Sequence, residues 1–455
     1  MKIYTRIVLL LTLLGVLASC AEDKDDNYIE IQQTSFDAWM AKHVNASGEV
    51  AAKLDKIGMY IELLETGRGG LATNDTTVWV RLNITGRDLH NNVYYTRSEE
   101  IARQQGTFDE HTHYVPEYLY CGSINSNMIA GQYFALKDTI SIHGGIPLKL
   151  TEGSKVRLYL PSWLAYGASG TSNDVGYGGQ FALKGDVPTI LDMEVVTITK
   201  DPQKYEEKQV DDFLAAHADQ EWTLVNDTLP YLYVDKKFRL SDDAPAYTGD
   251  SIHADSIVKV WYVGKFLDGF VFDTNIDSVQ TRLYGRPSDN NKFFQPDSSI
   301  DGYKVGTGGT ISGWEYALQE LRYGQWAKLV FTSEYGYGIT GVPATNPNNS
   351  SSSSSNYYYY NNLYSSMYDY NYGYGYGGYG YGYGGYGYGY DNYYDYYSYY
   401  NYQNYLNSLY SQNTTTTTTT QSITTEIQSY TPLVFEIYIE TNQSSGNDDD
   451  DNEDD

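Results

Sequence analysis

The run of residues 306–338 constrains the fold of this 455-residue chain more than any other stretch of its sequence. Gly313 and Gly324 bracket a segment whose apolar residues recur at helical spacing, so we expect a helix of about two turns that begins near Gly313 and ends at Gly324. Residues 326–332 follow with β-branched and aromatic side chains and predict a strand. A short helix that leads straight into a strand and buries one apolar stripe indicates an α+β fold. The stripe consists of Trp314, Ala317, Leu318 and Leu321.

Two flanking stretches complete a pattern with this run. Residues 260–273 read as a strand, a turn and a second strand that ends on the pair Phe272-Asp273, and residues 433–437 read as a further apolar strand. Together with Gly313-Trp314, these stretches resemble the FKBP-type peptidyl-prolyl cis-trans isomerases. The resemblance implies a curved antiparallel sheet wrapped around one short helix, with an apolar pocket between the sheet and the helix.

The chain also contains an internal repeat. Residues 36–43, Phe-Asp-Ala-Trp-Met-Ala-Lys-His, are echoed by residues 210–217, Val-Asp-Asp-Phe-Leu-Ala-Ala-His, and both segments are helix-like. His43 and His217 coincide in the repeat and lack Cys, His or carboxylate partners at ligand spacing, which favours helix-end or packing roles over metal binding. Two further pairs of segments match: residues 77–86 with 257–264, and residues 164–167 with 335–338.

The repeat predicts a tandem organisation. We expect an α+β chain of two FKBP-like domains, residues 21–200 and residues 201–442, each a curved antiparallel sheet around a short helix. Each domain is preceded by its own helix, and Asp201-Pro202 marks the linker between them.

The resemblance assigns a proline-binding pocket to the second domain. Isomerisation requires no acid, base or nucleophile in the usual sense, because the barrier of ~20 kcal/mol is lost amide resonance. An apolar pocket lowers this barrier by desolvating the amide and favouring its twisted form. Asp273 and the hydroxyls of Tyr262 and Tyr337 would orient the peptide backbone. The residues at the family's site positions are Tyr262, Phe272, Asp273, Ile311, Trp314, Tyr337 and Phe435.

Two observations weigh against this assignment. Taken singly, each of these aromatic residues is better explained by core packing than by a site role, since any small domain buries several. The stretch between Asp273 and Gly306 is also longer than in the family, and it leaves Asp301 where an aromatic wall residue is expected.

The first domain departs from the family at the same positions. Tyr95 stands in place of the Asp273 carboxylate, and His143 stands in place of Trp314. A polar pocket floor without the orienting acid predicts weak isomerase activity or none, and favours a structural or protein-binding role. The corresponding residues are Ile84, Tyr94, Tyr95, His143, Tyr166 and Leu191.

Residues 1–20 have the pattern of an export signal. Lys2 and Arg6 precede an apolar run, residues 7–17, that is too short to span a bilayer. The small residues before Cys20 resemble a bacterial lipobox, so we expect Cys20 to be acylated and to anchor the protein in a membrane of the bacterial cell envelope. The domains would then face the periplasm or the cell surface. The acidic run 22–26 reads equally as a surface-export tag or as a solvated tether.

Charge and cysteine content exclude several other classes. The formal net charge is -28, and no Lys or Arg follows Lys328, so a nucleic-acid partner is not expected. Outside the signal the only cysteine is Cys121, which reads as a small buried residue and not as part of a disulfide framework. We expect no cofactor and no metal.

A low-complexity insertion, residues 345–425, interrupts the second domain with runs of Ser, Tyr-Gly and Thr. In the family this loop overhangs the proline pocket, so its tyrosines would form an arm that captures client chains or glycans. A tolerated low-complexity expansion is the favoured explanation of the insertion, because each doubling of loop length adds only ~0.6 kcal/mol. Residues 443–455 read as a solubilising acidic tail.

These expectations combine into one prediction with one alternative. The protein is predicted to be a lipid-anchored peptidyl-prolyl cis-trans isomerase whose second domain acts on X-Pro bonds of extracytoplasmic, proline-containing polypeptides. The alternative is a non-enzymatic surface lipoprotein that uses both domains as binding or adhesive scaffolds. The Phe272-Asp273 and Trp314 set, retained in one domain only, favours the enzyme.

Overall fold

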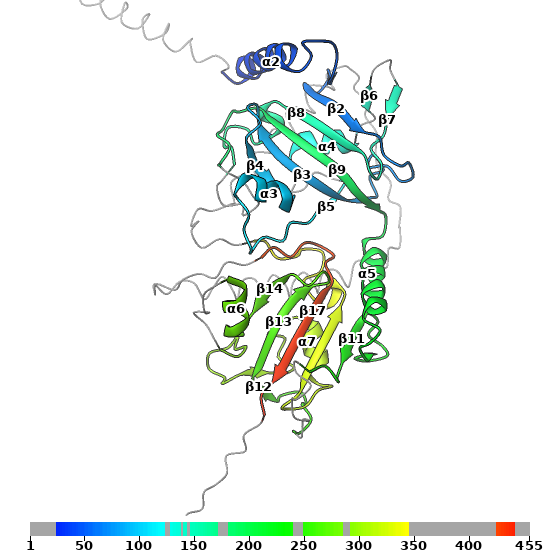
Figure 1. Cartoon of the computed structure of the whole chain (residues 1–455), viewed down its shortest axis with the longest axis vertical. Helices are drawn as coiled ribbons and strands as arrows, with labels where there is room; N and C mark the ends of the chain where they lie inside the picture. Colours follow the sequence, from blue (N-terminus) through cyan, green and yellow to red (C-terminus); the bar gives the residue numbers. More distant parts are fainter. Residues whose placement is uncertain are drawn as a thin grey trace, which may run out of the picture. The chain divides into compact units, whose positions relative to one another are not determined.

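The computed structural model describes residues 24–122, 128–137, 140–142, 146–171, 181–239, 249–284, 292–344 and 425–441. The chain divides into two compact units (Figure 1): unit 1 holds residues 1–108 and 114–200, and unit 2 holds residues 109–113 and 201–455. Cys20, His143, the acidic tail and the predicted insertion up to residue 424 lie outside the described residues.

Unit 1 is built on an antiparallel sheet that has seven strands among the described residues. The strand order is β1-β2-β8-β9-β3-β4, and β5 pairs with β3 beside this path, while β6 and β7 form a separate hairpin. The strands are β1 (Ala52–Leu54), β2 (Met59–Glu65), β3 (Trp79–Asp88), β4 (Val93–Thr96), β5 (Glu117–Tyr120), β6 (Ile140–Ile142), β7 (Ile146–Leu148), β8 (Lys155–Leu160) and β9 (Thr189–Thr199). The helices are α2 (Lys24–His43), α3 (Glu99–Gln105), α4 (Ala130–Lys137) and the 3-10 turn η2 (Ser162–Leu164).

Unit 2 repeats this plan on a sheet with six described strands. The order is β10-β11-β16-β17-β13-β14, and β12 pairs separately with β15. The strands are β10 (Trp222–Leu224), β11 (Leu232–Asp235), β12 (Ile257–Val258), β13 (Val260–Phe266), β14 (Val271–Thr274), β15 (Tyr303–Lys304), β16 (Trp326–Phe331) and β17 (Leu433–Ile439). The helices are α5 (Pro202–Ala216), α6 (Asp277–Tyr284), α7 (Ser312–Leu318) and the 3-10 turn η3 (Ser333–Tyr335).

The two sheets share one topology. Strands β1, β2, β8, β9, β3 and β4 of unit 1 stand in the same order as β10, β11, β16, β17, β13 and β14 of unit 2. Every pairing along both paths is antiparallel. The predicted α+β class, with an antiparallel sheet and helices in each unit, is confirmed.

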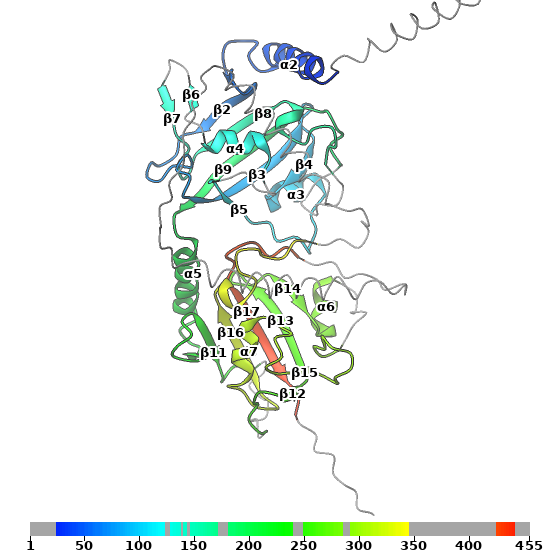
Figure 2. The same ribbon diagram turned by 180° about the vertical axis from the view of Figure 1, so that it is seen from behind.

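Strand alternation explains why helices cover both faces of the unit 2 sheet. Successive side chains of a strand point to opposite faces, so Leu329 and Phe331 lie in the cluster that contains α7, whereas Val330 lies in a second cluster. In that second cluster Val330 packs with Val434 of β17 and with Val210 of α5. Figure 2 shows α7 in front of the sheet. Both faces of the sheet therefore carry buried side chains, and α7 packs against the face that presents Leu329 and Phe331.

Helices α2 and α5 end in the same way. His217 is the C-cap of α5, and its ring lies 4.1 Å from the ring of Phe213, one turn earlier. His43 ends α2 and stacks on Trp39 at 5.1 Å. Both histidines thus take the helix-end and packing role that the repeat predicts.

The predicted end of the short helix is wrong. Helix α7 stops at Leu318, whereas Gly324 lies in the turn before β16 with φ +79°. Leu321 keeps the helical spacing in the sequence and is buried, but its amide bonds to the Leu318 carbonyl in a turn. The apolar stripe therefore extends beyond the helix that carries its first three members.

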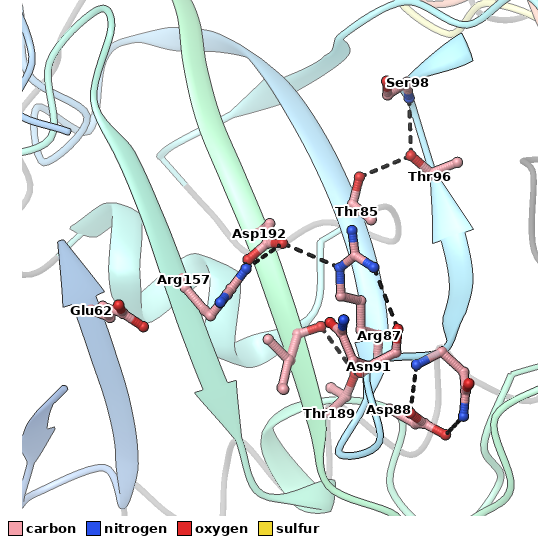
Figure 3. A network of polar contacts seen from close by, with 12 residues as sticks. Glu62, Thr85, Arg87, Asp88, Asn91, Thr96, Ser98, Arg157, Thr189 and Asp192 are labelled. Atoms are coloured by element: carbon pink, nitrogen blue, oxygen red, sulfur yellow. Dashed lines mark hydrogen bonds and ion pairs between the residues drawn. The ribbon is translucent and has the colours of Figure 1, made fainter. Parts of the chain in front are cut away.

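A carboxylate on the central strand of each sheet lies between two cations. In unit 1, Asp192 of β9 accepts hydrogen bonds from Arg157 Nε at 2.6 Å and Arg87 Nε at 3.3 Å, as Figure 3 shows. In unit 2, Glu436 of β17 lies 2.7 Å from Lys265 Nζ and 3.7 Å from Lys328 Nζ. Both arrangements join three adjacent strands through one ion cluster.

Two further features belong to unit 2. Its segment Asp109–His113 places the His113 ring on Phe266 at 4.4 Å, with Nε2 2.7 Å from Asp268 Oδ2. Val342 and Ile427 exchange both backbone hydrogen bonds, at 2.7 and 2.9 Å, and so close the base of the long insertion. None of the helices in the described part of the chain is long and apolar enough to cross a membrane.

Candidate active site

The predicted site residues come from four elements of unit 2. β13 carries Tyr262, β14 carries Phe272 and Asp273, α7 carries Trp314, and β17 carries Phe435. Ile311 is the N-cap of α7, and Tyr337 follows η3.

Gly264 allows two of these rings to meet. It lies opposite Asp273 on β14 and opposite Phe435 on β17. A Cβ atom at this position would lie 2.7 Å from Phe272 Cζ and 3.0 Å from Phe435 Cε1, so any larger residue would push the rings away. The glycine of the strand is therefore a requirement of the site.

Trp314 is the centre of an aromatic cluster. Its ring centroid lies 5.1 Å from that of Tyr262, 5.2 Å from Phe435 and 5.4 Å from Phe294, each in an edge-to-face arrangement. Phe272 joins through Phe435 at 5.6 Å, again edge to face. Such arrangements suit the quadrupoles of the rings and hold each ring in a defined orientation.

Burial divides the cluster into a floor and a border. Trp314 and Phe435 are each 3% exposed and belong to the hydrophobic core of the unit. The Nε1 atom of Trp314 is buried and finds no hydrogen-bond partner among the described residues. The half-buried residues packed against this floor include Tyr262, Phe272, Ile311 and Tyr337.

One carboxylate lies at the border of the cluster. Tyr262 donates its hydroxyl hydrogen to Asp273 Oδ2 at 2.6 Å. Desolvation by the surrounding protein raises the pKa of Asp273, and the hydrogen bonds from Tyr262 and the Thr274 amide oppose this shift. The residue as a whole is exposed, so the carboxylate keeps access to solvent. Among the described residues, Tyr262 and the Thr274 amide are its hydrogen-bond donors, which leaves further acceptor positions for a donor from outside the protein.

Side-chain hydrogen bonds fix the strand that presents Tyr262. Asn275 Oδ1 accepts from the Tyr262 amide at 2.8 Å, and Thr274 Oγ1 donates to the Tyr262 carbonyl at 2.6 Å. Both partners come directly after Asp273 in the sequence, so the same hairpin positions the acid and the tyrosine.

Phe294 is a site residue that the sequence did not reveal. Asp301, at the position where an aromatic wall residue was expected, is instead an exposed partner of Lys259 at 2.9 Å. Phe294, which lies in the long stretch between Asp273 and Gly306, supplies an aromatic ring beside Trp314 instead. Its amide donates to the Val260 carbonyl at 2.9 Å. The aromatic pair Phe293-Phe294 was the signal available in the sequence.

Unit 1 places different side chains at the equivalent positions. Gly86 lies opposite Tyr95 on β4 and Leu191 on β9, as Gly264 lies opposite Asp273 and Phe435. A Cβ atom on Gly86 would lie 2.4 Å from the Tyr94 ring, so the glycine again makes room for an aromatic side chain. Strand register thus supports the pairing of Tyr95 with Asp273.

Polar contacts within unit 1 occupy these side chains. Tyr95 donates to Glu117 Oε1 at 2.6 Å and accepts from Arg97 Nε at 2.7 Å, and Arg97 pairs with Glu117 at 3.0 Å. Tyr94 lies edge to face with Tyr166 at 5.6 Å, and its hydroxyl lies 2.8 Å from Thr189 Oγ1. Burial raises the pKa of Tyr166. Ile84 and Leu191 are buried.

The described residues contain no group of three or more His, Cys, Asp or Glu side chains arranged to hold a metal ion. The chemistry available at the candidate site is that of aromatic rings, one carboxylate and hydroxyl groups.

Comparison with known proteins assigns the family. Residues 249–352 match the profile described as FKBP-type peptidyl-prolyl cis-trans isomerase. FK506-binding protein 1A of Aspergillus fumigatus is 36% identical over 87 residues, which are 18% of this chain and 75% of that protein. Peptidyl-prolyl cis-trans isomerase Fkbp12 of Drosophila melanogaster is also 36% identical over 87 residues, covering 78% of its length. The chain belongs to the FKBP-type peptidyl-prolyl cis-trans isomerases.

A solved structure of the three FKBP domains of wheat FKBP73 aligns with 86% of this chain and 98% of its own. The sequence identity is 11% and the TM-score 0.23. The family assignment rests on the sequence relatives.

Proposed function

We propose that unit 2 catalyses cis-trans isomerisation of X-Pro bonds in extracytoplasmic polypeptides, with the proline bound in an apolar pocket over Trp314. The observation that carries this proposal is the arrangement of Trp314 and Phe435 as a buried aromatic floor with half-buried rings and one carboxylate at its border. The family membership of residues 249–352 supports the same reaction.

The reaction needs an environment that favours a twisted amide over both planar forms. A planar amide is stabilised by resonance that separates charge, so moving it from water to an apolar surface weakens this resonance and lowers the barrier of ~20 kcal/mol. Because Phe272 and Phe435 meet edge to face, the proline ring would rest on rigid walls. Binding that is stronger for the twisted form than for the planar forms accelerates the reaction.

Asp273 would orient the substrate. Tyr262 already donates its hydroxyl hydrogen to this carboxylate, so Tyr262 holds Asp273 in place and the remaining lone pairs of Asp273 can accept from the peptide. No step of this mechanism transfers a proton to or from the protein.

A direct assay tests the proposal. The full chain should accelerate isomerisation of a short X-Pro peptide, measured by the approach of the two isomers to equilibrium. A rate equal to that of the uncatalysed peptide, with the protein folded, would favour the alternative of a non-enzymatic binding protein.

We also propose that the protein is anchored to a membrane of the bacterial cell envelope through an acylated Cys20, because the sequence before Cys20 resembles a lipobox. Cys20→Ser should move the protein from the membrane fraction to the soluble fraction. A Cys20→Ser protein that stays with membranes after a high-salt wash would place the anchor elsewhere.

A further inference from the structure

A buried glutamate joins helix α5 to the chain segment that carries Tyr337. Glu206 is 1% exposed, and its carboxyl group accepts hydrogen bonds from the Ser333 amide at 3.0 Å and from Ser333 Oγ at 2.9 Å. Ser333 is the first residue of η3, two residues after the end of β16. Glu206 therefore binds both hydrogen-bond donors of the residue at which the chain leaves the sheet.

Ser333 in turn fixes the backbone on both sides of Tyr337. Its carbonyl accepts from the Gly336 amide at 2.9 Å and from the Gly338 amide at 2.8 Å. The turn is short, and Gly338 has φ +59°, a conformation that glycine adopts without strain. A displacement of Ser333 would thus be transmitted directly to the two residues that flank Tyr337.

Unit 1 contains the same contact with a neutral side chain. Gln32 of α2 stands four residues before Phe36, as Glu206 stands four residues before its repeat counterpart Val210. Ser162 Oγ donates to Gln32 Oε1 at 2.6 Å, and the Ser162 carbonyl accepts from Gly167 at 2.8 Å. The recurrence of a helix-to-serine contact in both units shows that it is part of the repeated fold, whereas the charge is specific to unit 2.

We propose that Glu206 is a positioning residue of the candidate site, which from the inner face of α5 holds the turn Ser333–Gly338 and thereby Tyr337. This inference rests on the proposed function of unit 2. It assigns the helix preceding the domain a part in the site, although that helix contributes no side chain to the aromatic cluster.

The electrostatic surroundings of Glu206 make its contact with Ser333 sensitive to pH. Burial raises the pKa of Glu206 to about 7, with further upward contributions from Glu334 on η3 and Glu207 on α5, while the two bonds from Ser333 oppose the shift. A carboxyl group whose pKa is raised in the folded state favours exposure once it ionises. Opening of the contact should therefore become easier as the pH rises through neutrality, and the neutral Gln32 contact should show no such change.

Three variants of the full chain test the inference. Glu206→Ala removes both acceptors and leaves the Ser333 donors buried and unpaired, so we expect kcat/KM to fall about fivefold to tenfold. Hydrogen exchange of a peptide covering residues 333–338 should speed up in the same variant. Glu206→Gln keeps one acceptor and should restore both properties to within about twofold. Gln32→Ala, the matched variant in unit 1, should leave kcat/KM unchanged.

Exchange at two pH values separates positioning from general stability. Between pH 6 and pH 8 the ratio of exchange rates for residues 333–338, native over Glu206→Gln, should rise because only the native residue ionises. Should Glu206→Ala not fold, Glu206→Asp withdraws the carboxyl group by one methylene and takes its place. A native-like kcat/KM and exchange rate in these variants, or an equal loss in Glu206→Ala and Glu206→Gln, would overturn the inference. An inactive native protein that shows the expected exchange pattern would refute the proposed function and leave the role of Glu206 in the turn intact.

Discussion

Units 1 and 2 share a strand order, a glycine at the same register position and a central carboxylate between two cations. They differ in the side chains at the positions of the candidate site. Unit 2 gathers aromatic rings around Trp314 and leaves Asp273 with unused acceptor positions. In unit 1 the equivalent Tyr95 is bound within the chain by Glu117 and Arg97. Among the described residues, the comparison shows a repeated strand order whose aromatic cluster around Trp314 is found in unit 2 and not in unit 1.

The difference concerns which polar groups remain available. A hydroxyl that already donates to one neighbour and accepts from another cannot orient a substrate without losing one of those bonds, whereas a carboxylate with one donor retains further acceptor positions. In unit 1 the hydroxyl of Tyr94 lies against Thr189, and that of Tyr95 is engaged on both sides. On this comparison we propose the chemistry for unit 2 and a structural or binding role for unit 1.

The largest effect is expected from Phe272→Ala. Removing this ring opens a gap beside Phe435 and lets water reach the amide, so kcat/KM for an X-Pro peptide should fall on the order of 100-fold, about 3 kcal/mol of transition-state stabilisation. The matched variant in unit 1, Tyr94→Ala, should leave kcat/KM unchanged. An active Phe272→Ala protein would show that proline binds elsewhere.

The next effect concerns stability. Because the pKa of Glu206 rises from 4.5 to about 7 on folding, the folded state binds the proton more tightly, and stability is lost as the pH rises through this window. We compare the unfolding free energy of the Glu206→Gln variant with that of the native protein at each pH. The variant's value minus the native value should increase by about 2 to 3 kcal/mol between pH 5 and pH 8. Urea unfolding measures this difference.

The reciprocal exchange in unit 1 sharpens the same comparison. Gln32→Glu introduces a half-buried carboxyl group beside the buried Ser162 and should give unit 1 a pH-dependent stability of the same sign. For both Glu206→Gln and Gln32→Glu, the difference in unfolding free energy between variant and native protein could stay constant with pH. That result would mean that neither position desolvates a carboxyl group in solution.

Asp273→Asn should have a smaller effect. The variant preserves the size of the side chain and an acceptor for Tyr262 but removes the charge. We therefore expect kcat/KM to fall by an amount equivalent to about 1 to 2 kcal/mol of transition-state stabilisation. Asp301→Asn is the control, because Asp301 is exposed and outside the aromatic cluster, and it should change kcat/KM less than about twofold. Equal losses in the two variants would indicate a general effect of charge.

The smallest effect is expected from Tyr95→Asp. This variant places a carboxylate at the position equivalent to Asp273, but unit 1 has Ile84 and Leu191 where unit 2 has Tyr262 and Phe435. In a chain inactivated by Phe272→Ala, it should restore no measurable isomerase activity. A gain in rate would show that the acid alone separates the two units.

Much of the fold could be predicted because its signals lie within short segments of the sequence. The apolar stripe from Trp314 and the repeat ending in His43 and His217 are read from spacing within short segments. The Phe272-Asp273 pair is recognised through the resemblance to the family. The end of α7 was wrong because Gly324 is a strong turn signal, while Leu318 gives no sign that the helix stops there.

The parts of the site that escaped prediction depend on distant segments. Phe294 reaches Trp314 from a stretch whose length differs from the family pattern, so counting positions pointed to Asp301 instead. Glu206 meets Ser333 across 127 residues of sequence. An ordinary helical glutamate gives no indication that it will be buried, and only the folded chain reveals its partner.

The paired backbone bonds between Val342 and Ile427 carry a consequence for the length of the insertion. These two bonds join the residues on either side of the insertion within unit 2. Lengthening or shortening the intervening segment changes only a slowly varying entropy, ~0.6 kcal/mol for each doubling. The length of the Ser, Tyr-Gly and Thr runs can therefore change at little cost in stability, while the backbone bonds of Val342 and Ile427 set where the segment leaves and rejoins the domain.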